Sequence, residues 1–263
     1  RVTVETPCAG RRCALLGATA PPDGDLLGTL LLAHTLRKEG AREVLVLVPY
    51  LGYARQDRPE PGRSAGAAWV GALLAATGAD RAVAVDVHSP AVPALFPIPL
   101  VSLSPAPVFA AAVTALGLPR PTVVAPDEGA RERAEAVRRA AGIERPLVSF
   151  VKMRAEAGVR HLPLSGQVGP RAVIVDDILD TGGTLVSACE RLREAGVSEM
   201  VVMVTHGLFT GAGWHRLWDL GVSRIYCSDT TPGPAAVDGR VTVLPVAGVL
   251  AAHLAGAPAA TAP

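Results

Sequence analysis

The chain has 263 residues, of which 49% are hydrophobic, so it can bury one large core or two modest ones. Its 25 Lys and Arg residues nearly balance 24 Asp and Glu residues, and the formal net charge is +1. This balance gives no electrostatic case for binding nucleic acid or an anionic membrane surface. No apolar run reaches the roughly 18–20 residues that cross a bilayer, so we expect a cytoplasmic protein without a membrane partner. The four cysteines include no C-x-x-C pair, which indicates reduced thiols.

Short runs rich in β-branched residues alternate with amphipathic stretches along the chain. This alternation predicts an α/β fold with mostly parallel sheets and crossover helices. In chain order, the expected strands are residues 43–48, 81–86, 100–103, 122–125, 147–151, 172–177, 200–205, 224–228 and 241–245. The expected helices are residues 26–39, 65–76, 108–116, 130–141 and 185–195.

A weak internal repeat indicates how many domains the chain contains. Residues 36–48 parallel residues 192–204, and residues 78–86 parallel residues 221–229. Two homologous α/β units are therefore expected.

The boundary between these units is expected in the proline-rich stretch at residues 104–107. The first unit then spans residues 1–105 and the second residues 106–247. Residues 248–256 are expected either to follow the second unit or to return to the first.

A phosphate-binding segment is predicted in the second unit. The apolar strand at residues 172–177 ends in two aspartates, and a Gly/Thr turn then opens a helix. Backbone amides at a helix N-terminus, freed of side-chain bulk by glycine, bind phosphate, and threonine hydroxyls add donors. Carboxylates beside that anion are expected to face sugar hydroxyls or Mg²⁺. A buried strand with a simple glycine turn would leave the acidic pair unexplained. The segment predicts a site for a phosphorylated pentose, formed by Asp176, Asp177, Asp180, Thr181, Gly182, Gly183 and Thr184.

The first unit carries a different polar cluster. Its matching stretch, residues 13–23, has neither the acidic pair nor the Gly-Gly-Thr turn. After the strand at residues 43–48, however, come Arg55, Gln56, Asp57 and Arg58. The arginines suit phosphate charge and Gln56 suits a base edge. From these residues alone, a nucleotide pocket and a solvated turn both stay open.

Two further pairs of residues follow predicted strands. His88 and Asp127 could together hold Mg²⁺ beside phosphate oxygens, although a histidine at a strand end is also compatible with a structural role. Lys152 and Arg154 open an expected long loop, residues 155–169, and suit a lid over transferring phosphates. A solvated basic turn is the alternative. It is weakened because only one other lysine occurs among the 25 basic residues.

Taken together, these residues resemble the ribose-phosphate pyrophosphokinases, or phosphoribosyl-pyrophosphate synthetases, over about residues 1–254. The similar motifs stand in that family's order and spacing. The resemblance implies two tandem phosphoribosyltransferase-like domains, each a mostly parallel sheet flanked by helices. It also implies transfer of the pyrophosphoryl group of ATP to the 1-hydroxyl of ribose 5-phosphate, with Mg²⁺ as cofactor, by a homo-oligomer, either a dimer or a hexamer. The motifs are residues 49–58, 86–88, 127–129, 176–184 and 205–207.

The resemblance also implies roles for single residues. ATP would be bound by Arg55, Gln56, Asp57, Arg58 and His88, and Mg²⁺ by His88 and Asp127. Lys152 and Arg154 would be the catalytic residues of the lid. Ribose 5-phosphate would be held by Arg154, Asp176, Asp177, Asp180, Thr181, Gly182, Gly183 and Thr184.

Several residues depart from the family pattern. The lid sequence Lys-Arg-Arg is Lys152-Met153-Arg154 here, so one cation is missing. Ala130 replaces a glycine and is expected to tolerate a positive φ poorly. Glu135 stands where arginine is usual, and Ser64 and Trp69 stand where Glu and Lys are usual. The family's acidic-aromatic segment, which receives adenine from a neighbouring subunit, would lie before Arg1.

Two other functions stay open. A phosphoribosyltransferase would share the pentose-phosphate loop but consume the pyrophosphorylated sugar, and the doubled domain argues against it. A non-catalytic regulatory homologue would bind nucleotide without turnover, and the missing lid arginine and Ala130 support it.

Overall fold

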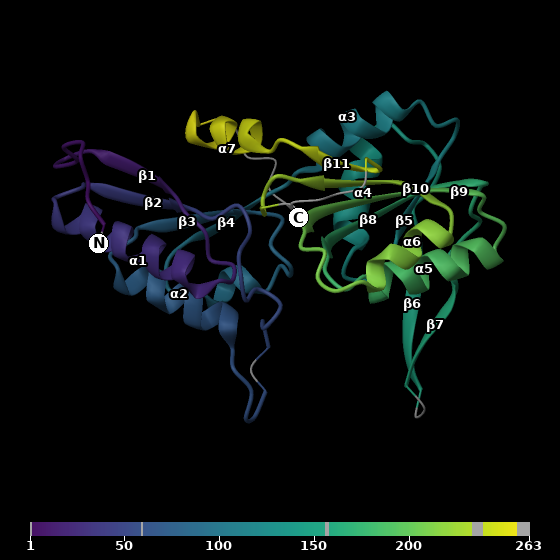
Figure 1. The fold of residues 1–263 in the computed structure, drawn as a ribbon, viewed down its shortest axis with the longest axis horizontal. Coiled ribbons are helices and arrows are strands. Elements are labelled where there is room, and N and C mark those ends of the chain that lie inside the picture. The colour runs from purple at the N-terminus through teal and green to yellow at the C-terminus, as the bar shows by residue number, and fades with distance from the viewer. Residues whose placement is uncertain (1, 59, 156–157, 233–238, 257–263) are drawn as a thin grey trace. The chain divides into compact units, whose positions relative to one another are not determined.

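The computed structural model describes residues 2–58, 60–155, 158–232 and 239–256, with the backbone alone at residues 151–163. The chain divides into two compact units, Arg1–Leu103 and a second that starts at Ser104. Each unit contains a mostly parallel sheet flanked by helices, which confirms the predicted α/β fold (Figure 1). Contacts within the chain group the C-terminal helix α7 (Ala247–Leu254) with the second unit.

The first unit has a four-stranded parallel sheet in the order β1-β2-β3-β4. Each new strand is added on the same side of the previous one, so right-handed crossovers place α1 and α2 on one face of the sheet (Figure 1). The core between them is mostly aliphatic and includes Val44, Val46 and Leu74. The elements are β1 (Arg12–Leu16), α1 (Asp23–Lys38), β2 (Glu43–Leu47), α2 (Gly66–Ala76), β3 (Arg81–Val85), the 3-10 helix η1 (Val92–Leu95) and β4 (Leu100–Leu103).

The second unit has a seven-stranded sheet in the order β11-β10-β9-β8-β5-β6-β7. Its strand pairs are parallel except β6 with β7. Among the described residues, no helix of either unit is long and apolar enough to span a bilayer. The elements are α3 (Ala106–Leu116), β5 (Thr122–Ala125), α4 (Arg131–Ala140), β6 (Val148–Ala155), β7 (Gly158–Leu164), β8 (Arg171–Leu179), α5 (Gly183–Glu194), β9 (Glu199–Gly207), η2 (Gly213–His215), α6 (Arg216–Asp219), β10 (Val222–Ser228), β11 (Val241–Leu244) and α7.

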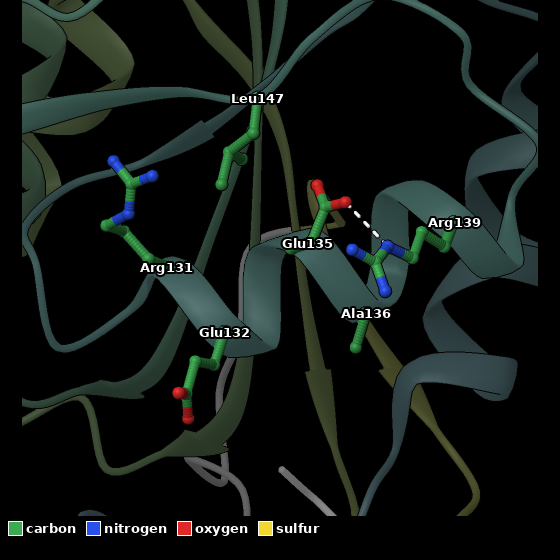
Figure 2. Close-up of a pocket in the computed structure, with 6 residues that line it drawn as sticks. All are labelled: Arg131, Glu132, Glu135, Ala136, Arg139 and Leu147. Carbon is green, nitrogen blue, oxygen red and sulfur yellow. Dashed lines mark hydrogen bonds and ion pairs between the residues drawn. The ribbon is translucent and has the colours of Figure 1, made fainter.

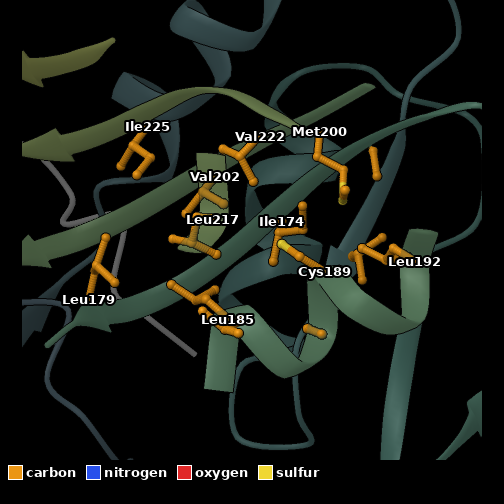
Figure 3. Packing of buried hydrophobic residues seen from close by; sticks show 14 of the residues in the cluster. Ile174, Leu179, Leu185, Cys189, Leu192, Met200, Val202, Leu217, Val222 and Ile225 are labelled. Carbon is orange, nitrogen blue, oxygen red and sulfur yellow. The ribbon is translucent and has the colours of Figure 1, made fainter. Parts of the chain in front are cut away.

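Strand β8 is buried on both faces of this sheet. Val173 and Val175 pack in a cluster with residues of α3 and α4, whereas Ile174 packs in a second cluster with residues of α5 and α6 (Figure 3). A strand covered on both faces needs apolar residues at successive positions rather than alternate ones. This explains why an almost continuous apolar run precedes the acidic pair.

The internal repeat is visible in the ends of the helices. Gly40 and Gly196 adopt left-handed φ values of 83° and 86° after α1 and α5, and each amide donates to the carbonyl three residues earlier at 3.0 Å. Gly78 and Gly221, at the starts of the second repeated segment, have φ values of 84° and 89°. Left-handed glycines commonly end helices because they carry no Cβ. The repeated segments therefore have the same local structure in both units.

The prediction of a long loop at residues 155–169 is wrong. Strand β7 (Gly158–Leu164) pairs antiparallel with β6, so most of the described residues in this range form an edge strand of the sheet and the segment that leaves it. Pro163 lacks an amide proton and is compatible with β7 because that strand lies at the sheet edge. Pairing with β6, which the local sequence does not reveal, stabilises the strand.

Candidate active site at the carboxyl edge of the second sheet

The strand order of the second sheet reverses between β5 and β8. From β5 the chain continues to β6 on one side, and from β8 it continues to β9 on the other. The connections after these two neighbouring strands therefore diverge at their carboxyl ends. In open α/β sheets, a crevice at such a reversal is the usual place for a ligand. Asp127 follows β5, and the segment from Asp180 to Thr184 follows β8.

The acidic pair lies in the last part of β8. Asp176 and Asp177 are 8% and 6% exposed, and the Asp176 Oδ1 atom accepts the Asp177 amide proton at 2.9 Å. An Arg133 nitrogen from α4 lies 4.0 Å from the Asp177 Oδ1 atom. Burial and then the charge of Asp177 raise the pKa of Asp176 well above its usual range, against the lowering effect of Arg133. Two buried carboxylates with one nearby guanidinium are typical of a functional site rather than of a core.

The segment after β8 forms a turn that opens α5. Gly182 is buried with φ 88° and ψ 0°, and its carbonyl accepts the Val186 amide proton at 2.8 Å. Gly183, Thr181 and Thr184 are exposed around the first turn of the helix. Amides at the N-terminus of a 12-residue helix attract anions through the helix dipole. The structure thus brings the predicted phosphate-binding residues together beside the acidic pair.

The turn is supported from behind by the segment that follows β9. A Cβ atom on Gly182 would lie 2.7 Å from the Trp214 Cα atom, and one on Gly213 would lie 2.8 Å from the Thr181 carbonyl oxygen. Trp214 itself packs edge-on against Phe209, with ring centroids 4.9 Å apart. Both glycines are therefore needed for the close approach of two chain segments.

Asp127 begins the connection from β5 to α4. Its Oδ1 atom accepts a hydrogen bond from the amide of Ala130, the residue before α4, at 3.1 Å. Ala130 has φ −87° and is 1% exposed. The expectation that alanine is strained at this position is wrong because the backbone is right-handed there. The exchange of glycine for alanine therefore leaves this turn intact.

Lys152 and Arg154 lie on the hairpin strand β6. In the backbone pairing, Lys152 is opposite His161 and Arg154 is opposite Val159. Their side chains lie outside the part of the chain that the structure describes. The two residues are thus placed on paired strands, not at the mouth of an irregular loop.

The predicted ATP-binding residues lie at the carboxyl edge of the first sheet. Arg55, Gln56 and Arg58 are exposed in the segment after β2, and Asp57 is half-buried there. The Gln56 Oε1 atom accepts the Ser64 hydroxyl at 2.8 Å. A half-buried His88 follows β3, the next strand of the same sheet, so all these residues belong to one edge.

The proposed metal ligands belong to different units. His88 is in the first unit and Asp127 is in the second, and each is described within its own unit. Over the described ranges, no three His, Cys, Asp or Glu side chains are gathered closely enough to hold a metal ion.

A separate hollow of about 540 Å³ lies along α4 and contains Glu135, the residue that replaces a usual arginine. Figure 2 shows the Glu135 carboxylate paired with Arg139 one turn further on, at 2.7 Å. Arg138 also donates to Glu135 at 2.6 Å, and these guanidinium groups lower the pKa of Glu135 to about 2. The acid is therefore part of an ion-pair cluster on the helix. The hollow is lined by Arg131, Glu132, Glu135, Ala136, Arg139 and Leu147.

Three residues of the site were not predicted from the sequence: Arg133, Thr210 and Trp214. Arg133 lies in the first turn of α4, six residues after Asp127, and its helical position was the only available signal. Thr210 and Trp214 follow the 205–207 motif, but their contacts cross about 30 residues of sequence. The hydrophobic periodicity of a sequence gives no information about contacts between residues so far apart in the chain.

The reversal of strand order, the acidic pair and the Gly-Gly-Thr turn define an α/β protein with a phosphoribosyltransferase-type site. A family model described as the phosphoribosyl transferase domain matches residues 111–220, and one for the N-terminal domain of ribose phosphate pyrophosphokinase matches residues 1–78. This chain belongs to the ribose-phosphate pyrophosphokinase family and is therefore a member of a family of transferase enzymes.

Similar proteins cover most of the chain. The ribose-phosphate pyrophosphokinase of Ralstonia nicotianae is 31% identical over 258 residues, which are 95% of this chain and 81% of that protein. The one from Vibrio vulnificus is 34% identical over 241 residues, or 88% and 76% of the two chains. The crystal structure of phosphoribosylpyrophosphate synthetase from Mycobacterium smegmatis superimposes with a TM-score of 0.84 at 28% identity, over 97% of this chain and 85% of that one. The similarity therefore includes both units.

Proposed function

We propose that this chain transfers the pyrophosphoryl group of ATP to the 1-hydroxyl of ribose 5-phosphate and releases AMP. The observation that carries the proposal is the acidic pair of β8 beside the Gly-Gly-Thr turn at the strand-order reversal, in a chain of this family. Because both substrates are phosphorylated intracellular metabolites, the enzyme is expected to act in the cytoplasm.

Ribose 5-phosphate is assigned to the second unit. Its phosphate would accept hydrogen bonds from amides and hydroxyls of Thr181 to Thr184, at the positive end of α5. Its ring hydroxyls would donate to Asp176 and Asp177, whose carboxylates are acceptors. Asp180 would accept from a further hydroxyl at the mouth of the turn. This arrangement holds a sugar with hydroxyls at one end and a phosphate at the other.

ATP is assigned to the polar edge of the first sheet. Arg55 and Arg58 provide positive charge for the phosphates, Gln56 suits the base edge, and Asp57 and His88 complete the cluster. The Ser64 hydroxyl that donates to Gln56 would fix the orientation of its amide.

The donor set fits Mg²⁺, since Asp127 offers hard carboxylate oxygens and Mg²⁺ usually takes only one or two protein ligands together with substrate phosphates. His88 would be the second protein ligand. When bound, Mg²⁺ would neutralise phosphate charge.

In the reaction, the 1-hydroxyl oxygen attacks the β-phosphorus of ATP. The bond from that phosphorus to the oxygen bridging to the α-phosphate breaks, AMP leaves with this oxygen, and the hydroxyl proton is released. Lys152 and Arg154 would stabilise the charge that develops on the transferring group, and Arg154 would also contact ribose 5-phosphate. Positioning and charge neutralisation supply most of the catalysis in such reactions.

The direct test is incubation of the protein with ATP, Mg²⁺ and ribose 5-phosphate, with AMP and the pyrophosphorylated sugar measured by chromatography. Both products are expected, in equal amounts and only when all three components are present. Nucleotide binding without products would favour the non-catalytic homologue. Consumption of added pyrophosphorylated sugar with a free base would favour a phosphoribosyltransferase.

A second experiment tests whether the turn after β8 binds ribose 5-phosphate. Asp180→Asn and Thr184→Val are expected to weaken ribose 5-phosphate binding in calorimetry without changing ATP binding. Asp219→Asn makes the same chemical change at an exposed position at the end of α6 and serves as the control. Weakened ATP binding with unchanged sugar-phosphate binding would assign the turn to the nucleotide instead.

We also propose that the chain forms homo-oligomers through its first unit. Leu27 and Leu31, one turn apart on α1, are 58% and 54% exposed. Exposed apolar clusters commonly mark contact surfaces. Sedimentation velocity should show an oligomer that Leu27→Glu dissociates, whereas Val243→Glu on β11 should not. A wild-type monomer at micromolar concentration would contradict this proposal.

A further inference from the structure

The turn that carries Asp180 is fixed by the segment after β9. The amides of Leu208 and Phe209 both donate to the Leu179 carbonyl at 2.9 Å, directly before Asp180. Trp214 closes the other end of the turn against Gly182. Asp180 thus lies between two points at which its own chain segment is held by another.

The supporting segment adopts an unusual backbone conformation at Phe209. Its φ is 50°, in the left-handed region that favours glycine, although it carries a large side chain that is only 8% exposed. Packing against Trp214 offsets this local cost. Left-handed residues of this kind are often retained where a neighbouring group must be placed accurately. The next residue along the chain is Thr210.

Thr210 contacts Asp180 through its side chain. The hydroxyl donates to the Asp180 Oδ1 atom, and Thr210 is exposed, so this contact is not part of a core. Because Thr210 is exposed, its side chain adds little packing energy that could offset the unfavourable backbone conformation of Phe209. The contact limits the rotation of a half-buried carboxylate at the mouth of the crevice.

We propose that Thr210 is a positioning residue that orients the Asp180 carboxylate for a ribose hydroxyl. The inference rests on the proposed function, since it assumes that the turn binds ribose 5-phosphate. A carboxylate already held in its binding rotamer loses less conformational freedom when the sugar arrives, which strengthens binding. Without the hydroxyl donor, the Asp180 side chain would sample other rotamers between binding events, and the sugar would bind more weakly.

The variants are chosen to separate the hydroxyl from the shape of the side chain. Thr210→Val keeps the branched shape and removes the donor, whereas Thr210→Ser keeps the donor. We expect Thr210→Val to raise KM and Kd for ribose 5-phosphate roughly tenfold, as loss of a hydrogen bond to a charged group does. KM for ATP should be unchanged, and Thr210→Ser should recover most of the affinity. Thr210→Ala, smaller than valine, provides a second variant without the donor.

A double-mutant cycle with Asp180→Ala tests whether Thr210 acts through Asp180. If it does, Thr210→Val adds little to the effect of Asp180→Ala, because the acceptor of the Thr210 hydroxyl is already removed. Thr114→Val on α3, whose hydroxyl donates to the Ala110 carbonyl at 2.9 Å, controls for loss of a hydroxyl elsewhere.

The outcomes separate this inference from the proposed function. Wild-type protein that does not bind ribose 5-phosphate in calorimetry would overturn both. Wild-type protein that binds it, together with a Thr210→Val variant of equal affinity, would overturn the inference alone. Additive effects in the cycle, or an equal loss of ATP affinity, would show that Thr210 serves the fold and not Asp180.

Discussion

Replacement of Gly182 by alanine tests how the proposed phosphate-binding turn is supported. The residue has φ 88°, and its new Cβ atom would lie 2.7 Å from the Trp214 Cα atom and 2.8 Å from the Trp214 Cβ atom. A left-handed conformation costs a residue with a Cβ about 1–2 kcal/mol. Overpacking against a fixed backbone costs about 1–3 kcal/mol more. Gly182→Ala is therefore expected to lower the free energy of unfolding by roughly 2–5 kcal/mol, out of a total of about 5–15 kcal/mol.

Gly183→Ala is the matched control. The adjacent glycine has no positive φ, begins α5, and a Cβ there would meet no atom within 4 Å. Alanine in a helix is more stable than glycine by about 0.5–1 kcal/mol, so this variant should be as stable as wild type or more so.

Urea unfolding measured by circular dichroism compares the two variants. With an m-value of about 1–3 kcal/mol/M, the urea midpoint of Gly182→Ala should fall by roughly 0.7 M or more, while m stays unchanged. A Gly182→Ala variant within about 0.5 kcal/mol of wild type would refute the reasoning, since surface substitutions commonly have effects of that size. Equal destabilisation by both variants would show that position 182 is not special.

Three further predictions concern catalysis, acid stability and thiol chemistry. Lys152→Ala should lower kcat and kcat/KM together by about 10²–10³-fold with nearly normal substrate binding, and Lys152→Arg should recover part of the rate; a raised KM at unchanged kcat would contradict a transition-state role. Glu135→Gln should cost about 1 kcal/mol of unfolding free energy at neutral pH. Because the folded-state pKa of Glu135 is lowered to about 2 from 4.5, the difference in unfolding free energy between the two proteins is present above pH 4.5 and should vanish as pH falls towards 2. A difference that stays constant throughout an acid titration of both proteins would show that the ion pairs are not its cause. Burial raises the pKa of the Cys189 thiol to about 12 and that of Cys227 to about 11, from 9.0, so the free energy of unfolding should fall as pH rises above 9. Iodoacetamide at pH 8 should leave both thiols unmodified in native protein. Rapid labelling seen by mass spectrometry would show that they are accessible.

The elements with strong local patterns could be predicted from the sequence. The strand at Leu100–Leu103 and the strand at Thr122–Ala125 have the expected bounds, because a buried parallel strand is an apolar run between turn residues. Strand β1 was not expected as a strand; it lies at the edge of the first sheet, where pairing with β2 stabilises it. Strand β7 was missed because its pairing with β6, not its composition, determines it.

The candidate site was predicted in part for the same reason. The acidic pair and the Gly-Gly-Thr turn are contiguous in sequence, so strand, turn and helix bring them together without help from distant residues. The contacts of Thr210 with Asp180 and of Trp214 with Gly182 join segments about 30 residues apart, and only the tertiary structure shows them. The backbone at Ala130 also depends on a distant setting, since α4 packs there against the sheet.

The buried carboxylate of Asp176 sets a limit on laboratory evolution of this enzyme. An amide at that position would keep an oxygen to accept from the Asp177 amide, whose nitrogen is now 2.9 Å from Asp176 Oδ1, and would remove a charge that burial and Asp177 both disfavour. A library screened only for survival of heat is therefore expected to accumulate Asp176→Asn. If Asp176 binds a ribose hydroxyl as proposed, these variants would be stable but less active, so screens for stability should keep this position unchanged.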